Sequence, residues 1–176
     1  MMQQLINQSL LIAHPHASDD FFSGSLVYVY EHQTSGSMGF MLNRQASIRL
    51  EKLMPTAPTS LCEQPVLIGG PVQTDHLFFI MVPLNEGSNP QIEIANNLDE
   101  AAANAEHPGQ LVLPMVGYAG WSEGQLESEI QRDVWLLTEP NLPTLLRVPS
   151  ERRYPAATEN LGFDPALMAP SARRPQ

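Results

Sequence analysis

Glu31 and His32 are neighbours whose types suit acid–base chemistry. A carboxylate beside an imidazole can raise the imidazole pKa and support proton transfer. The two residues end a run of β-branched and aromatic residues that predicts a strand. Successive strand residues point to opposite faces, so the two side chains would not naturally meet. Two interpretations remain open: a polar end of a strand, which we favour, and an acid–base pair.

Two glycine-containing segments could place backbone close to a ligand. Gly69-Gly70-Pro71 follows a short apolar run. A glycine pair there can expose N–H groups to an anion, or it can form an ordinary sharp turn. The glycines of Gly36-Ser37-Met38-Gly39 indicate a turn and close backbone approach. Asn43, at the end of the next predicted strand, has an amide that can both donate and accept hydrogen bonds.

The stretch from Gly117 to Ile130 combines three glycines, two aromatic residues and three carboxylates. Its first half predicts a turn. Its second half predicts a helix, because Ser122 and Gln125 have the spacing of a capping box. Tyr118 and Trp121 fit either an aromatic wall beside N–H groups of the helix start or ordinary packing, which we favour.

The sequence contains no strong catalytic or metal-binding signature. Neither a phosphate-binding loop nor a Gly-x-Ser-x-Gly elbow is present. Cys62 is the single cysteine, which excludes a cysteine-based zinc cage and an intrachain disulfide. His14 and His16 have no third ligand at a known spacing. We therefore predict no catalytic residue, no metal site and no cofactor.

Composition favours one soluble, acidic domain. The 176 residues can bury a proper core. We expect one domain over residues 1–165 and a fraying tail over 166–176. The net charge of −10 would repel a phosphate backbone and disfavours direct DNA binding. The arginines near the C-terminus are interpreted as solvated charges: Arg147, Arg152, Arg153, Arg173 and Arg174.

Two further features predict a cytoplasmic protein without a membrane segment. The first eleven residues lack the cationic start and long apolar stretch of a signal peptide. No apolar run approaches the roughly 18 residues that a membrane span requires.

The periodicity predicts an α+β or mixed α/β single domain, with a mixed, partly antiparallel sheet of about six or seven strands and several short helices. Pro114 predicts an edge or a bend in its strand. Residues 134–137 fit a helix or a strand. Strands are expected at 9–14, 25–32, 38–43, 65–68, 77–82, 91–95 and 110–116, and helices at 48–54, 97–106, from 122, 143–148 and 150–161.

Several segments, taken in order and spacing, resemble the AlgH/YqgE family of small bacterial proteins. The resemblance spans about residues 9 to 165. It is carried by Leu11-Ile12-Ala13-x-Pro15, Asp19 with Phe22, Ser25 to His32, Gly36-x-Met38-Gly39 through Asn43, Gly69-Gly70-Pro71-Val72, and Gly117-Tyr118-Ala119-x-Trp121 through Ile130 with Trp135.

This resemblance implies a single cytosolic α/β domain of complex topology and a transcriptional-regulator label. It implies no known catalyst. The glycines and polar residues shared with the family imply a surface crevice. By position, the crevice would include Glu31, His32, Asn43, Gly69, Gly70, Tyr118, Trp121 and Gln125.

The chain also departs from the family pattern. It has Asp19-Asp20 where Asp-Pro is common, Tyr30 where Cys is frequent, and Met81 where His is frequent. A mechanism that needs that thiol or that histidine is not available here.

Two functions follow as hypotheses. The first is a non-enzymatic binding or regulatory protein, with a crevice for an unknown small molecule or protein partner. The alternative is a hydrolase or transferase that acts on an anionic substrate, with Glu31 or His32 as the acid or base.

Overall fold

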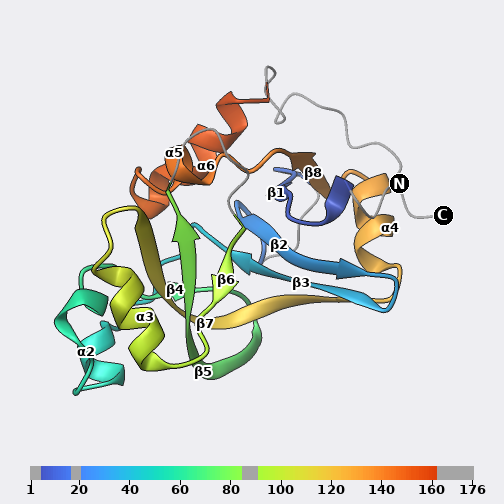
Figure 1. Cartoon of the computed structure of the whole chain (residues 1–176). Coiled ribbons are helices and arrows are strands. Elements are labelled where there is room, and N and C mark those ends of the chain that lie inside the picture. Colours follow the sequence, from blue (N-terminus) through green and yellow to red (C-terminus); the bar gives the residue numbers. More distant parts are fainter. Residues whose placement is uncertain (1–4, 17–20, 85–90, 162–176) are drawn as a thin grey trace.

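A mainly antiparallel sheet organises the chain (Figure 1). The computed structural model describes residues 5–16, 21–84 and 91–161. The strand order is β6-β5-β7-β3-β2-β1-β8, and β4 pairs with β7 in parallel. This confirms the predicted mixed, partly antiparallel sheet. The strands are β1 (Leu10–Ala13), β2 (Leu26–Gln33), β3 (Gly36–Met41), β4 (Leu67–Ile68), β5 (Val72–Pro83), β6 (Glu93–Ile94), β7 (Gln110–Ser122) and β8 (Trp135–Thr138).

Short helices cover the sheet in three places (Figure 1). Helices α2 and α3 lie beside the part of the sheet where β4 pairs with β7. Helices α5 and α6 lie over a different part of the sheet, and α4 lies near the end of the β2–β3 hairpin. The core divides into three clusters of buried apolar side chains. The helical elements are α2 (Leu50–Leu53), the 3₁₀ turn η1 (Thr59–Leu61), α3 (Leu98–Ala105), α4 (Gln125–Gln131), α5 (Leu142–Leu145) and α6 (Ser150–Glu159).

Helix α3 begins where its sequence predicts. The Asn97 side chain accepts a hydrogen bond from the Glu100 N–H at 2.8 Å, and Glu100 Oε1 accepts one from the Asn96 N–H at 2.7 Å. These bonds satisfy N–H groups that the helix cannot satisfy internally. The expected helices at 48–54 and 143–148 are shorter, at one turn each. The stretch from Trp135, open between helix and strand, is strand β8.

Strand β7 corrects one expectation and agrees with another. The turn predicted from Gly117 is wrong, because the strand continues to Ser122, and α4 starts only at Gln125 after Gly124. Half of the predicted capping box still forms, since Gln125 Oε1 accepts from the Ser122 N–H at 2.9 Å. Strand β7 is central in the strand order, but at Pro114 one of its sides has no described strand as partner, which is the local edge that the sequence predicts. Pro114 is tolerated because β7 pairs there with β5 alone.

The close crossing of two backbone segments joins the halves of the sheet. Gly69 and Gly70 pass directly against Gly117 and Tyr118 of β7. A Cβ atom on Gly70 would overlap the Tyr118 carbonyl group, and one on Gly117 would overlap the Gly70 oxygen. Gly117 also has a φ of 74°, which favours glycine. Beyond this crossing, β7 leaves β5 and pairs with β3.

A partly buried carboxylate group fixes α4 to the sheet. Glu129 Oε1 accepts hydrogen bonds from the indole N–H groups of Trp121, at 3.0 Å, and Trp135, at 2.9 Å. Gln125 donates to the other oxygen at 3.0 Å. The two indole rings meet edge to face, with centroids 6.1 Å apart. This arrangement satisfies polar atoms that would otherwise destabilise the core.

The helices in the described part of the chain are too short or too polar to span a membrane.

The crossing predicts a steric effect at Gly70. Gly70→Ala should lower the free energy of unfolding by about 3 kcal/mol, because its Cβ would overlap Tyr118 backbone atoms. Gly24→Ala is the matched control, since Gly24 has a φ of 71° but open space around its Cβ position. It should lose only about 1–2 kcal/mol, from backbone strain. Urea unfolding measures both losses, and equal losses would contradict the close-approach argument.

The hydrogen bond from Trp121 to Glu129 predicts that two substitutions of Trp121 destabilise the protein by different amounts. The exposed fraction of this residue is only 7%. Trp121→Ala should destabilise the protein by about 3–5 kcal/mol through the cavity it leaves. Trp121→Phe keeps an aromatic ring and removes the N–H donor, so it should lose less, about 1–3 kcal/mol. A loss below about 1 kcal/mol for Trp121→Ala would be inconsistent with a buried indole.

Candidate functional site

An open groove lies between the β2–β3 hairpin and strands β5 and β7. Its volume is about 500 Å³. We call it the hairpin groove, and the described residues that line it are Glu31, Gln33, Ser35, Gly36, Ser37, Met38, Val72, Tyr118, Gly120 and Trp121.

The floor of the hairpin groove depends on a glycine. Met38 pairs with Gly120 across β3 and β7. A Cβ atom on Gly120 would have only the Tyr118 ring, at 3.8 Å, and the Val72 side chain, at 3.9 Å, within van der Waals contact. Glycine within a strand often marks a place where a ligand or another backbone approaches closely. The missing side chain keeps this part of the groove open.

Three of the eight predicted crevice residues line this groove: Glu31, Tyr118 and Trp121. Trp121 belongs to the buried cluster beside α4, and its indole donates to Glu129. The Tyr118 ring lies beside Gly120, two residues along the same strand. Strand alternation therefore separates the two aromatic rings between opposite faces of the sheet.

Glu31 is the only acidic or basic side chain among the described residues that line the groove. It is exposed, and Gln33 donates a hydrogen bond to its Oε1 at 2.5 Å. The described lining thus combines an apolar wall with one carboxylate and no cation. This composition suits a neutral or cationic group better than an anion.

His32 lies apart from Glu31, as strand alternation predicts. Its side chain is fully buried, its Nδ1 hydrogen-bonds the Ser37 hydroxyl, and its Nε2 lies 3.5 Å from Glu127 Oε2. The carboxylate beside His32 is therefore Glu127 from α4, not Glu31. In the sequence, Glu127 lies on the polar face of the predicted helix. No local pattern of residues predicts that this face contacts His32.

The other predicted crevice residues have contacts within the fold. Asn43 accepts from the Leu26 N–H at 3.0 Å and donates to Gly24 O at 2.8 Å, which ties the loop before β2 to the end of β3. The Gly69 N–H donates to Val116 O at 2.8 Å. Gly70 is buried at the crossing, and Gln125 bonds Ser122 and Glu129. The structure does not bring these four residues to the hairpin groove.

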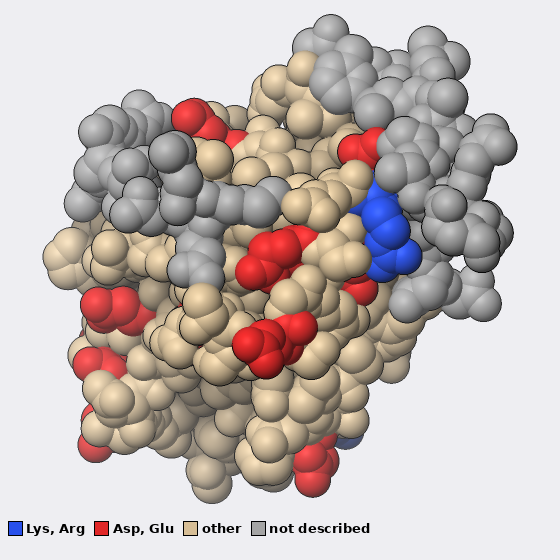
Figure 2. Space-filling view, turned by 90° about the vertical axis from the view of Figure 1, so that its right-hand side faces the viewer, with Lys and Arg blue, Asp and Glu red and all other residues tan. Residues whose placement is uncertain are grey.

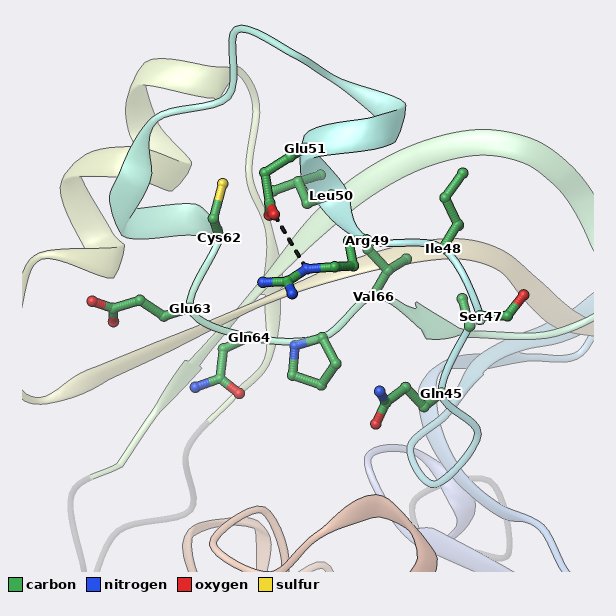
Figure 3. A pocket seen from close by; sticks show the side chains of 12 residues that line it. Gln45, Ser47, Ile48, Arg49, Leu50, Glu51, Cys62, Glu63, Gln64 and Val66 are labelled. Carbon is green, nitrogen blue, oxygen red and sulfur yellow. Dashed lines mark ion pairs between the residues drawn. The ribbon is translucent and has the colours of Figure 1, made fainter.

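A second cavity of about 460 Å³ lies between residues 45–51 and 62–66 (Figure 3). An ion pair between Arg49 Nε and Glu51 Oε2, at 3.2 Å, crosses it. Cys62 also lines it. Removal from water and the nearby Glu51 raise the pKa of the Cys62 thiol. A raised pKa disfavours the thiolate, so this cysteine is poorly suited to act as a nucleophile.

In the described part of the chain, no group of three or more His, Cys, Asp or Glu side chains could hold a metal ion. On the face shown in Figure 2, carboxylates are scattered, whereas Lys and Arg gather at one main place.

Comparison with known proteins gives matches along nearly the whole chain. A family model described as AlgH-like matches residues 10–166. A UPF0301 protein of Ralstonia nicotianae is 38% identical over 180 residues, which cover 96% of this chain and 94% of that protein. The UPF0301 protein Bpet0561 of Bordetella petrii is 34% identical over 177 residues, covering 94% and 88%.

Two solved structures share the fold. The solution structure of the AlgH protein from Pseudomonas aeruginosa has a TM-score of 0.69 and 32% identity, covering 96% of this chain and 94% of that one. The crystal structure of protein DIP2367 from Corynebacterium diphtheriae has a TM-score of 0.74 and 20% identity, covering 92% and 90%, and supports the fold alone. The family-model match and the relatives above 30% identity agree with the segments noted in the sequence, and the chain therefore belongs to the AlgH-like family.

Proposed function

We propose that this chain is a non-enzymatic binding or regulatory protein, and that the hairpin groove holds a small molecule or a segment of a protein partner. The observation that carries the proposal is the open glycine floor at Gly120 beside the Tyr118 ring. Glu31 at the same groove favours a neutral or cationic ligand.

A hydrolase remains the second candidate because of one specific arrangement. Ser37, which lines the groove, hydrogen-bonds His32 Nδ1, and Glu127 lies 3.5 Å from the other ring nitrogen. A hydroxyl, an imidazole and a carboxylate in this order form the nucleophile, base and orienting group of acyl-transfer enzymes.

Two features argue against that candidate. Ser37 pairs with His32 on one side and with Trp121 on the other, so its N–H points within the sheet rather than toward a substrate. Catalysts of this kind need N–H donors aimed at the developing oxyanion. The His32 side chain is also fully buried, which leaves it no route to a leaving group in the groove. These features favour the binding protein over the hydrolase.

Filling the groove tests the binding proposal. Gly120→Val should keep the fold, because its Cβ would make ordinary contacts and valine suits a strand. A panel of neutral and cationic metabolites should contain compounds that stabilise the unsubstituted protein, by about 2.7 kcal/mol at 100 times the dissociation constant. Gly120→Val should abolish that gain in a thermal-unfolding assay.

Thr74→Val is the matched control, because Thr74 is exposed on β5 and does not line the groove. This variant should respond to the same compounds as the unsubstituted protein. A flat response of the unsubstituted protein to the whole panel, or an equal response of Gly120→Val, would refute the proposal.

The two candidate functions predict different results with generic ester substrates. For a binding protein, hydrolysis should stay at the buffer background in the unsubstituted chain, in Ser37→Ala and in Glu127→Gln. Hydrolysis above background that both substitutions abolish, and that Glu31→Gln leaves unchanged, would instead support the Ser37–His32–Glu127 enzyme. Glu31→Gln is a suitable control because the Glu31 side chain bonds Gln33, whereas His32 pairs with Ser37 and Glu127.

A further inference from the structure

A third cavity, of about 530 Å³, lies at the start of α6. We call it the α6 cavity. Among the described residues, its charged lining residues are Arg147 and Arg153, and none of the lining residues described is acidic. This is unusual in a chain with a net charge of −10. Apolar side chains, among them Leu111 and Leu146, form another part of the wall.

Arg153 is the residue that calls for an explanation. The sequence analysis interpreted it as a solvated charge, and that is wrong, because only 5% of the residue is exposed. Its Nε donates to Val148 O at 3.0 Å and its Nη1 to Leu42 O at 2.6 Å. Both acceptors are neutral carbonyl groups. Among the described residues, no carboxylate lies within ion-pair distance of the guanidinium, and none accepts a hydrogen bond from Nη2.

A buried cation without a counter-charge is unfavourable. Burial lowers the pKa of the Arg153 guanidinium, and the charge of Glu151 offsets this only in part. Arginine stays protonated at neutral pH, so the positive charge persists in the cavity wall. An anion from solution would supply the missing partner.

The first turn of α6 provides a second set of donors at the same place. No side chain caps this ten-residue helix, and Pro149 occupies the N-cap position. Ser150, the first helical residue, is buried and lines the cavity. Among described groups, none accepts a hydrogen bond from the N–H of Ser150 or of Glu151. Such N–H groups and the positive end of the helix dipole favour an anion.

We propose that the α6 cavity binds a small organic phosphate. The phosphate oxygens would accept from Arg153 Nη2 and from the first N–H groups of α6, with Arg147 at the rim. Several donors from different directions suit a tetrahedral anion with several oxygens. The organic part would rest against the apolar wall at Leu111 and Leu146. This site is separate from the hairpin groove and does not depend on its ligand.

The test titrates the full chain with inorganic phosphate and, in parallel, with phenyl phosphate. Backbone amide resonances are followed by NMR. Saturable shifts are expected at Ser150 and Glu151 for both probes. Phenyl phosphate should bind more tightly, because its ring can contact the apolar wall.

Two exposed arginines provide matched variants with the same change of charge. Arg147 lines the cavity and Arg152, on the same helix, does not. Arg147→Gln should weaken phosphate binding by about tenfold, the loss expected for one charge-assisted hydrogen bond. Arg152→Gln should leave it nearly unchanged. Arg153→Lys keeps the buried charge but loses the planar fork, and it too should weaken binding.

Loss of binding in Arg147→Gln and in a folded Arg153→Lys, but not in Arg152→Gln, would support the proposal. Equal weakening in Arg147→Gln and Arg152→Gln would overturn it, because the effect would then be one of net charge. Absence of saturable shifts at Ser150 and Glu151 would overturn it as well. Gly120→Val should bind phosphate normally, so failure here is distinguishable from failure of the hairpin groove.

Discussion

The fold depends on the close approach of two backbone segments, at Gly69–Gly70 and at Gly117–Tyr118. Strand β7 can pair with β5 before this point and with β3 after it only because no Cβ atom keeps the segments apart. Hydrogen bonds complete the junction. The Gly69 N–H donates to Val116 O, and Gly69 O accepts from the Met41 N–H. The segment after β4 thus joins strands β3 and β7 at this junction.

This junction also determines what each side chain beyond it can do. Tyr118 and Gly120 face the hairpin groove, whereas Ala119 and Trp121 belong to the cluster beneath α4. Trp121 in turn donates to Glu129, which also accepts from Trp135. One end of β7 therefore forms a groove on one face and fixes a helix on the other. A shift of one residue in its pairing would exchange the two sets.

The molecule separates its charges between its two candidate sites. Of the lining residues that the structure describes, those of the hairpin groove include one carboxylate, Glu31, and no cation, whereas those of the α6 cavity include Arg147 and Arg153 and no acid. Interaction between charges at close range is strong where water is excluded and weak where it is not. The local lining, and not the net charge of −10, therefore decides which ligand each site favours.

Local patterns in the sequence predicted the strands of the hairpin, the start of α3 and the separation of Glu31 from His32, because strand alternation and helix capping act over a few residues. Family membership followed from ordered segments along the chain. Only the tertiary structure placed Glu127 beside His32 and Glu129 between two indoles, and only it buried Arg153 against Leu42 O, 111 residues away. These contacts join distant segments. Their partners depend on how strands and helices pack, which no local pattern of residues specifies.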